Sequence, residues 1–391
     1  MATITSAGIT IGTAGALTPI GPGTIRRTSR PASGEECPVR RSTDFAELSE
    51  QVKEAGLLRR RRVYYWSKFW LITIVLAFLV VLFVRGGNSW WQMPLAGVFA
   101  VAFTQAAFLG HDAAHRQVFQ SGRWNNWASL IMGNLFVGMS VGWWNNKHTR
   151  HHANPNRIGY DPDLDIPVVQ PGGLMRLRER SRLARWTLDH QSIGFFPFLF
   201  FQGLILHISS FGRVFGRANV PHRSVEISLM LARLGGFIGL TFLVLSPGRA
   251  GTFLGIEFAV FGFYLGAVFA INHMGMPLVP KSQKLDFFRR QVLTGRNIRG
   301  GQLTSFTMGG LNYQIEHHLF PSMARPQLRH AAPLVRAFCK ERNVTYTETG
   351  IRQAFRSVTN YIDNVGLGDQ DPFECPMIAG RQTATPVNCA T

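Results

Sequence analysis

The chain of 391 residues is 46% hydrophobic and 12% aromatic but only 16% charged, against roughly 25% charged residues in soluble domains. This composition argues against an ordinary soluble domain and favours a membrane protein. The net charge of +19 suits either a nucleic-acid binder or the cytoplasmic surface of a membrane. The long apolar runs favour the membrane.

Both ends of the chain are rich in small and turn-forming residues. Residues 1–43 lack the charged start and long apolar core of a secretory signal, and residues 367–391 are rich in Gly, Asp, Pro and Thr. Such segments bury too little apolar surface to order themselves. We therefore expect disordered tails at 1–43 and 367–391, flanking one domain at 44–366.

An amphipathic helix is predicted at 44–58, with an Asp44…Glu47 capping pattern at its start. The arginines at 59–62 then precede the first apolar run and place the N-terminus on the cytoplasmic side. Four runs are long and apolar enough to cross a membrane, namely 66–84, 90–110, 225–245 and 251–271. The sequence thus predicts an all-α integral membrane protein with about four spans in two hairpins.

Two further apolar runs are predicted to lie in the membrane interface. The run at 195–211 is shorter and interrupted by Pro197, Gly203 and His207, and the run at 126–144 separates two histidine clusters. Clusters that share one centre must lie on one side of the membrane, so the number of crossings between them must be even, and the hairpin at 225–271 already supplies two. The segment from 327 to 366 is predicted to form cytosolic helices that complete a cap carrying the metal site.

Histidines gather in three short clusters, each beside an apolar run. The clusters are "HDAAH" with His111 and His115, "HTRHH" with His148, His151 and His152, and "QIEHH" with Gln314, His317 and His318. Spacings of three or four residues place imidazoles on one helical face. Imidazole is the commonest metal ligand among side chains, so we predict a metal site on the cytoplasmic side.

Seven or eight imidazoles exceed the three protein ligands of a catalytic zinc, so the sequence predicts two metals. His273, directly after the last apolar run, is the eighth candidate, with a helix-capping role as the alternative. Neutral imidazoles suit iron, copper or zinc alike. Acidic neighbours could orient the ring N–H groups or be plain surface charges; they are Asp112, Asp161, Asp163, Asp165 and Glu316.

The three clusters follow the order His-x3-His, His-x2-His-His and Gln-x2-His-His. This order resembles that of the integral-membrane fatty acid desaturase family, as do the flanking segments "GHDAAHRQ", "NKHTRHHANPN" and "GGLNYQIEHHLFPSM". The resemblance implies two iron ions that activate O2 and remove hydrogen from an acyl methylene pair, leaving a cis double bond. It also implies the iron ligands, which are His111, His115, His148, His151, His152, His317 and His318, with His273 as a further one.

Gln314 departs from the three-histidine form of the last box and is similar to the glutamine of linoleoyl-CoA and other front-end desaturases. Its amide offers no imidazole, so we expect a weaker or outer ligand. Such relatives often carry a cytochrome b5 domain with a His-Pro-Gly-Gly motif, which this sequence lacks. We therefore expect a separate electron donor, a ferredoxin or a flavin and iron–sulfur reductase, and the positive charge favours an acidic one.

Two further partners are expected, an acyl substrate in the form of acyl-CoA or acyl-lipid, and the lipid bilayer. We expect this bilayer to be the plasma membrane of a prokaryote. The sequence leaves the oligomeric state open. Five arginines suit either anionic lipid headgroups or coenzyme A phosphates and a reductase; they are Arg176, Arg178, Arg180, Arg182 and Arg185.

The sequence leaves four other functions to compare with this one. A hydroxylase or epoxygenase of the same fold shares the first C–H abstraction, and spacing does not exclude it. A haem-binding or metal-transporting membrane protein would carry its histidines inside the spans, whereas here they lie just outside. A zinc-dependent lipid hydrolase would need fewer ligands, and the apolar hairpins disfavour a nucleic-acid binder.

Overall fold

The computed structural model describes residues 43–164 and 191–365. The predicted tails lie outside these residues except for Thr43. Other predictions that lie outside them concern Asp165 and the arginines Arg176, Arg178, Arg180, Arg182 and Arg185.

The amphipathic helix predicted at the start of the domain is α1 (Asp44–Glu54). Its N-cap is Thr43, whose hydroxyl accepts a hydrogen bond from the Ala46 N–H at 3.2 Å, so the predicted cap at Asp44 was one residue late. Leu48 and Val52 are fully buried in a hydrophobic cluster that they share with residues of α11 (Phe287–Leu293), α13 (Gln314–Leu319) and α14 (Arg325–Glu341).

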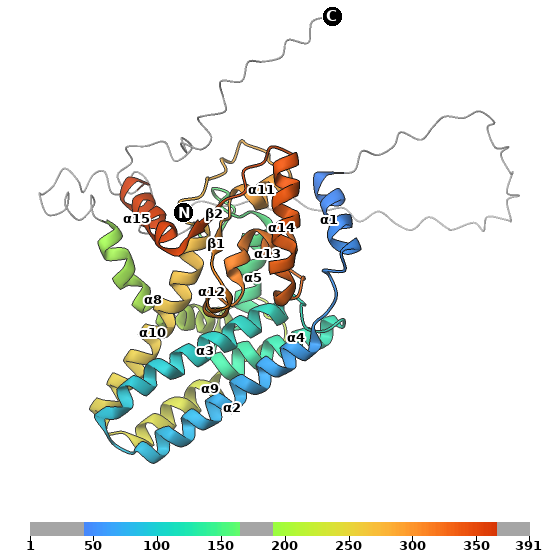
Figure 1. The fold of residues 1–391 in the computed structure, drawn as a ribbon. Coiled ribbons are helices and arrows are strands. Elements are labelled where there is room, and N and C mark those ends of the chain that lie inside the picture. The colour runs from blue at the N-terminus through green and yellow to red at the C-terminus, as the bar shows by residue number, and fades with distance from the viewer. Residues whose placement is uncertain (1–42, 165–190, 366–391) are drawn as a thin grey trace, which may run out of the picture. The chain divides into compact units, whose positions relative to one another are not determined.

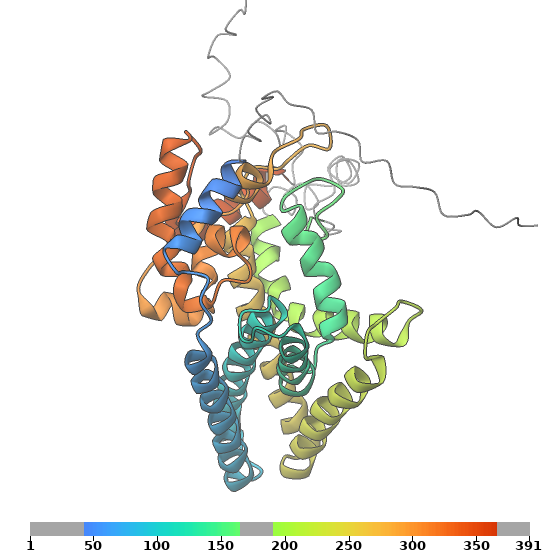
Figure 2. The ribbon, with the colours of Figure 1, turned by 90° about the vertical axis from the view of Figure 1, so that its right-hand side faces the viewer.

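Two hairpins of long apolar helices form the membrane part, as predicted. In Figures 1 and 2, α2 lies beside α3, and α9 lies beside α10. The hairpins are α2 (Arg62–Gly86) with α3 (Met93–Ala114), joined through a 3-10 turn (Trp90–Gln92), and α9 (Arg223–Val244) with α10 (Pro247–His273). Aromatic rings link the hairpins far from the histidines, since Phe83 lies 4.8 Å from Phe253 and Phe99 lies 5.4 Å from Phe237, centroid to centroid.

The run at 195–211 belongs to a longer helix than the sequence predicted. Helix α8 (Gln191–Phe215) has 25 residues and, by length and apolar composition, is a fifth candidate for a membrane span in the described chain. The contacts around α8 favour the predicted position in the membrane interface over a membrane span. Ser192, at its start, hydrogen-bonds Asp363 of the cap at 2.8 Å, and Glu226, in the helix that follows, accepts from the Gly142 N–H beside the second histidine box at 2.8 Å. The start of α8 and the start of the following helix are therefore both tied to the histidine side.

Helix α8 crosses α10 at glycines. A Cβ atom added to Gly203 would lie 2.4 Å from the Phe258 carbonyl oxygen, and one added to Gly262 would lie 2.2 Å from the Gly203 nitrogen. Only small residues allow two helices to approach this closely. The glycine that looked like a helix break in the sequence is thus the contact that fixes α8 on α10, which carries His273.

The run at 126–144 is not one element. It divides into α4 (Gly122–Leu130), a π-helical segment (Ile131–Val137) and the first turn of α5 (Val141–Ala153). Gly138 ends the π-helical segment with φ +89°, and Ser140 then caps α5 by accepting from the Trp143 N–H at 3.0 Å. This break turns the chain so that α5 leaves the apolar layer.

The cap follows α10 and lies at one end of the long helices in both views (Figures 1 and 2). It contains α11 (Phe287–Leu293), α12 (Gln302–Thr307), a 3-10 turn (Leu311–Tyr313), α13 (Gln314–Leu319), α14 (Arg325–Glu341) and α15 (Ile351–Val365). The prediction of helices alone at 327–366 missed one short strand. β1 (Asn297–Arg299) and β2 (Glu348–Gly350) pair in parallel.

A buried ion pair joins the cap to the first hairpin. The Arg325 guanidinium of α14 lies 2.6 Å from the Asp112 carboxylate of α3, and these side chains are only 11% and 3% exposed. Arg325 also donates to the Phe108 carbonyl at 2.8 Å, and its main-chain N–H donates to the Tyr65 hydroxyl of α2 at 3.0 Å. One residue thus holds the end of the cap against both helices of the hairpin.

Candidate metal centre

Four helix ends bring the predicted histidines together. His111 and His115 lie at the end of α3, and His273 is the last residue of α10. The second box lies on α5 and the third on the short α13 of the cap. The structure therefore gathers all eight histidines that the sequence singled out, and they form two groups.

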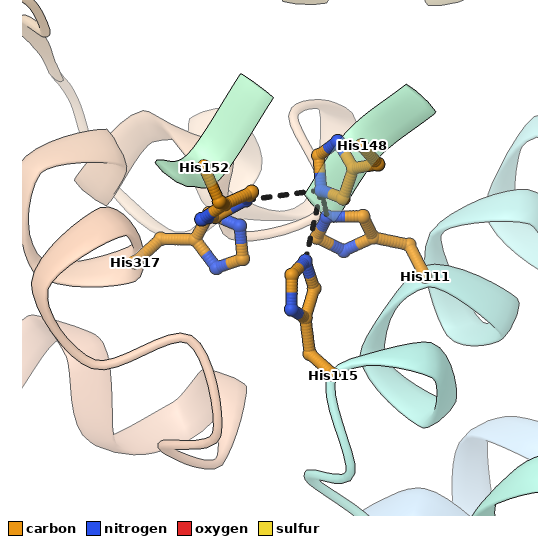
Figure 3. Close-up of side chains that lie close together, drawn as sticks. All are labelled: His111, His115, His148, His152 and His317. Atoms are coloured by element: carbon orange, nitrogen blue, oxygen red, sulfur yellow. Dashed lines mark hydrogen bonds between the residues drawn. The ribbon is translucent and has the colours of Figure 1, made fainter. Parts of the chain in front are cut away.

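The first group contains five imidazoles whose nearest ring nitrogens all lie within 4.8 Å of one another, namely His111, His115, His148, His152 and His317. Figure 3 shows them converging from α3, α5 and α13. The Nε2 atom of His148 lies 3.0 Å from that of His111, 2.8 Å from that of His115 and 3.0 Å from that of His152.

The second group contains His151, His273 and His318, again with ring nitrogens within 4.8 Å of one another. The Nε2 atoms of His151 and His273 are 3.3 Å apart. His152 of the first group stacks on His318 of the second with ring centroids 4.1 Å apart, so the two groups are direct neighbours. His151 and His152 are consecutive yet join different groups, because neighbouring side chains on a helix point about 100° apart.

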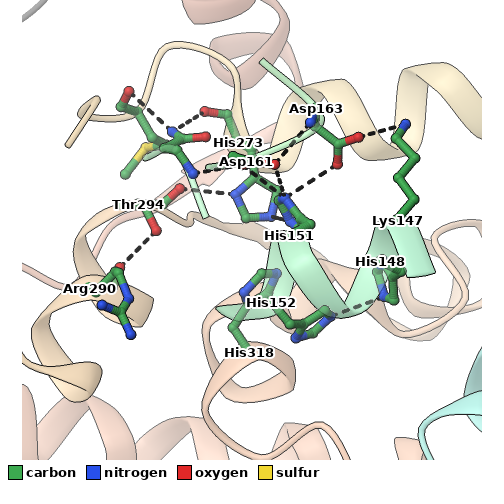
Figure 4. Close-up of polar contacts among 12 residues, drawn as sticks. Lys147, His148, His151, His152, Asp161, Asp163, His273, Arg290, Thr294 and His318 are labelled. Carbon is green, nitrogen blue, oxygen red and sulfur yellow. Dashed lines mark hydrogen bonds and ion pairs between the residues drawn. The ribbon is translucent and has the colours of Figure 1, made fainter. Parts of the chain in front are cut away.

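Hydrogen-bond acceptors fix two of the three rings of the second group, as Figure 4 shows for His151 and His273. His151 Nδ1 lies 3.0 Å from both Asp161 oxygens, and His273 Nδ1 lies 3.0 Å from the Thr294 carbonyl. A carboxylate and a carbonyl accept only, so in both rings Nδ1 carries the proton and Nε2 keeps its lone pair. Metal-binding histidines are held in this way.

Gln291 of α11 fixes the third ring. Its side-chain nitrogen donates to the His152 carbonyl at 2.9 Å, which turns its oxygen toward His318 Nδ1 at 3.0 Å. Because that oxygen only accepts, His318 Nδ1 donates and Nε2 remains free. Gln291 thereby connects the second box to the third. It is fully buried.

The donor atoms fit two metal ions. Nitrogens bound to one ion at about 2.1 Å and about 90–110° apart would lie roughly 3.0–3.4 Å from each other, and the observed separations within the groups include 3.0 and 3.3 Å. In addition, His317 Nε2 and His318 Nε2 are buried without a hydrogen-bond partner among the described residues, one in each group. Buried polar atoms rarely stay unpaired, so each group offers an atom that an ion would satisfy.

Electrostatics keep most of these imidazoles neutral, as metal ligands must be. Burial, and then the charge of neighbouring imidazoles, lowers the pKa of five histidines outside the spanning helices, which are His115, His148, His152, His317 and His318. For His151, burial lowers the pKa, but the hydrogen bond to Asp161 and the charge of Asp163 outweigh it and raise the pKa.

The acidic neighbours have different roles. Asp161 holds His151, which was one of the two alternatives that the sequence left open. Asp163 lies 3.3 Å from the same ring nitrogen and 2.7 Å from Lys147. Glu316 instead accepts from Asn297 at 2.7 Å and from Tyr346 at 2.8 Å, which anchors α13 to β1 and to the segment before β2. Asp112 pairs mainly with Arg325.

Gln314 presents its nitrogen to the second group. Asn272 donates to the Leu311 carbonyl at 3.2 Å and to the Gln314 side-chain oxygen at 3.1 Å. The Gln314 amide nitrogen is therefore the atom that lies 2.8 Å from His273 Nε2. An amide nitrogen is a hydrogen-bond donor and has no lone pair suited to a metal.

Sequence reasoning missed several residues of the site. Gln291, Thr294 and Asn272 are isolated polar residues without any spacing signal, and only the fold brings them to the histidines. Trp144 was also missed; its ring stacks on His148 with centroids 4.8 Å apart. Its position one turn before His148 on α5 is the only local signal for this contact.

Replacing Gln291 with leucine should weaken metal binding by about 10- to 100-fold, because outer residues that orient a metal-bound histidine typically contribute that much. The measurement is metal retained by the purified protein after dialysis against graded chelator. Gln291→Glu keeps the acceptor for His318 and should retain more metal than the leucine variant. Equal retention by the leucine variant and the unchanged protein would show that Gln291 does not position His318.

Comparisons with known proteins agree with this architecture. The sequence profile of the fatty acid desaturase family matches residues 88–350. An acyl-lipid (9-3)-desaturase of Physcomitrium patens is 29% identical over 79% of this chain, which spans 60% of that relative's length. A Delta(8)-fatty-acid desaturase of Helianthus annuus is 26% identical (80% of this chain, 71% of the relative), and the Delta(5) fatty acid desaturase fat-4 of Caenorhabditis elegans is 31% identical (77% and 69%).

The apolar hairpins and the two imidazole groups beside them define an integral membrane protein with a histidine cluster capable of binding metal. The chain belongs to the fatty acid desaturase family. It is a membrane fatty acid desaturase, an oxidoreductase of lipid metabolism, as the order of its histidine boxes predicted.

Proposed function

We propose that the two imidazole groups bind two iron ions and that this centre introduces a cis double bond into an acyl chain. The observation that carries the proposal is the division of eight buried or half-buried histidines into two adjacent groups with converging nitrogens. Iron in both groups would activate O2 for removal of hydrogen from a methylene pair. The proposed ligands are His111, His115, His148, His152 and His317 for one ion, and His151, His273 and His318 for the other.

The chain's own residues orient this centre. Asp161, Thr294 and Gln291 hold the Nδ1 protons of the second group, so that all three Nε2 atoms face inward. Trp144 limits rotation of the His148 ring by stacking on it. We assign Gln314 the role of a hydrogen-bond donor beside the second ion and not that of a direct ligand, since its oxygen is engaged by Asn272.

The substrate is proposed to be an acyl chain esterified to coenzyme A or to a membrane lipid. Relatives with Delta(5), Delta(8) and acyl-lipid (9-3) in their names support a double bond introduced at a fixed position relative to one end. A hydroxylase outcome would need the same ligands, but the names of these relatives favour desaturation.

The histidine boxes are proposed to face the cytoplasm, because four arginines lie at the start of α2 on their side of the hairpins. Arg59, Arg60 and Arg61 precede the helix, and Arg62 is its first residue. The relatives come from a moss, a plant and a nematode and lend no support to a prokaryotic plasma membrane. Electrons are proposed to come from a separate ferredoxin or flavin and iron–sulfur reductase. The net charge of +19 would favour an acidic donor.

Metal analysis of the purified protein tests the centre. Protein produced with iron should contain two iron ions per chain, and His318→Ala should lower the content toward one, because it removes a ligand of the second group only. A single ion in the unchanged protein, or zinc retained in preference to iron, would contradict a di-iron centre.

A further inference from the structure

A strongly basic groove lies between the link from α1 to α2 and the start of α14. Its volume is about 980 Å³. Six basic side chains line it, and no carboxylate does; the six are Arg59, Arg60, Arg61, Arg62, Arg329 and His330. The groove is separate from both imidazole groups, and none of the residues proposed to bind metal lines it.

The start of α2 indicates that the basic groove lies at the depth of lipid headgroups. Arg62 is the first residue of α2, one of the helices that can span the membrane. In the first turns of that helix Trp66 and Trp70 are 47% and 55% exposed, and exposed tryptophans of membrane helices concentrate at the headgroup level. Arg60 donates to the Ser322 carbonyl at 2.6 Å, which ties the link between α1 and α2 to the loop that follows the third histidine box.

No carboxylate of the described residues neutralises the positive charges of the groove. Within residues 43–164 and 191–365 none of the six side chains forms an ion pair, although other arginines do, such as Arg289 with Asp44 and Arg336 with Glu348. Arg329 donates from Nε to the Nε2 atom of the neighbouring His330 ring at 3.0 Å, so the five guanidinium groups are the cations of the groove. Guanidinium groups match phosphate oxygens in shape and charge, and a choline headgroup would add one more cation to the groove.

We propose that this groove binds the phosphate of an anionic glycerophospholipid headgroup. A concave site at headgroup depth suits a lipid better than it suits the surface of a soluble protein. If the proposed desaturation holds, the bound lipid is the acyl carrier, so that the substrate is an acyl-lipid and not acyl-CoA.

Titration calorimetry on the full chain in detergent tests the binding. The probes are the soluble lipids dihexanoyl-phosphatidylglycerol and dihexanoyl-phosphatidylcholine, and coenzyme A. We expect the phosphatidylglycerol to bind at least tenfold more tightly than the other two. The variant Arg59→Gln/Arg61→Gln/Arg329→Gln changes three exposed residues and should weaken that binding at least tenfold.

A matched control separates the groove from net charge. Lys281→Gln/Lys284→Gln/Lys340→Gln removes the same three charges from exposed positions outside the groove and should leave binding unchanged. Equal weakening in the control, or no preference for phosphatidylglycerol, would overturn the proposal. Tighter binding of coenzyme A that the arginine variant removes would assign the groove to coenzyme A. Arginine-dependent binding of an acidic ferredoxin without lipid affinity would assign it to the electron donor.

The titration needs no turnover, so it stands apart from the proposed reaction. The identity of the carrier is tested in reconstituted protein with a phosphatidylglycerol ester and a coenzyme A ester of the same acid. The arginine variant should raise KM for the lipid ester and leave kcat unchanged. If lipid binding persists while neither ester is desaturated, the proposed reaction is wrong, and the proposal that the groove binds an anionic lipid still holds.

Discussion

Replacing His151 with alanine is expected to abolish double-bond formation. His151 belongs to the second imidazole group, and its ring is held by Asp161 at 3.0 Å. Loss of a direct ligand should cost more than the roughly 10- to 100-fold loss typical of outer residues. The measurement is the yield of unsaturated acid in cells that express the variant with a reductase. Membrane insertion should stay intact, because α5 lies outside the candidate spans.

The control for this variant is His222→Asn. His222 is an exposed histidine outside both groups, and its φ of +55° is one that asparagine tolerates. Its activity should equal that of the unchanged protein. Retained activity in His151→Ala, at equal amounts of membrane-inserted protein, would show that His151 is not an essential ligand.

Replacing Asp112 with alanine should destabilise the protein by about 3–5 kcal/mol, the usual cost of leaving one buried charge without its partner. Arg325 is 11% exposed and would keep its charge without the carboxylate at 2.6 Å. Because Arg325 also bonds Phe108 and Tyr65, the contact between cap and hairpin should open first. Thermal unfolding in mild detergent, followed by tryptophan fluorescence, measures the loss.

A second substitution distinguishes the ion pair from the general effect of a changed residue. Asp112→Ala combined with Arg325→Met removes both charges and should recover much of the lost stability, since an apolar pair of similar volume often replaces a buried ion pair without cost. An unchanged melting temperature in Asp112→Ala alone would mean that water or another group compensates Arg325.

The hairpins and the histidine boxes could be predicted because their signals are local. Apolar runs of sufficient length and spacings of three or four residues need no knowledge of the fold. The length of α8 could not be predicted in the same way. Gly203 reads as a break in the sequence, but it is required where α8 meets α10, and His207 reaches the Val137 carbonyl at 3.2 Å. These residues serve tertiary contacts.

The division of the histidines into groups of five and three could likewise not be predicted from the sequence. It depends on how α5 is rotated between α3, α10 and α13, which sends His148 and His152 to one group and His151 to the other. The orientation of Gln314 depends on Asn272 and, through it, on the Leu311 carbonyl. Such networks are set by tertiary packing, so spacing alone could identify Gln314 as a candidate but not decide its role.

The most direct test of the central claim is a fatty acid methyl-ester profile, by gas chromatography and mass spectrometry, of cells that express the unchanged protein with a matching reductase. The account predicts a new unsaturated acid, with its double bond at one defined position, that is absent from cells expressing His151→Ala. A new hydroxy acid in its place, or an unchanged profile despite full iron occupancy and electron supply across a range of acyl substrates, would contradict it.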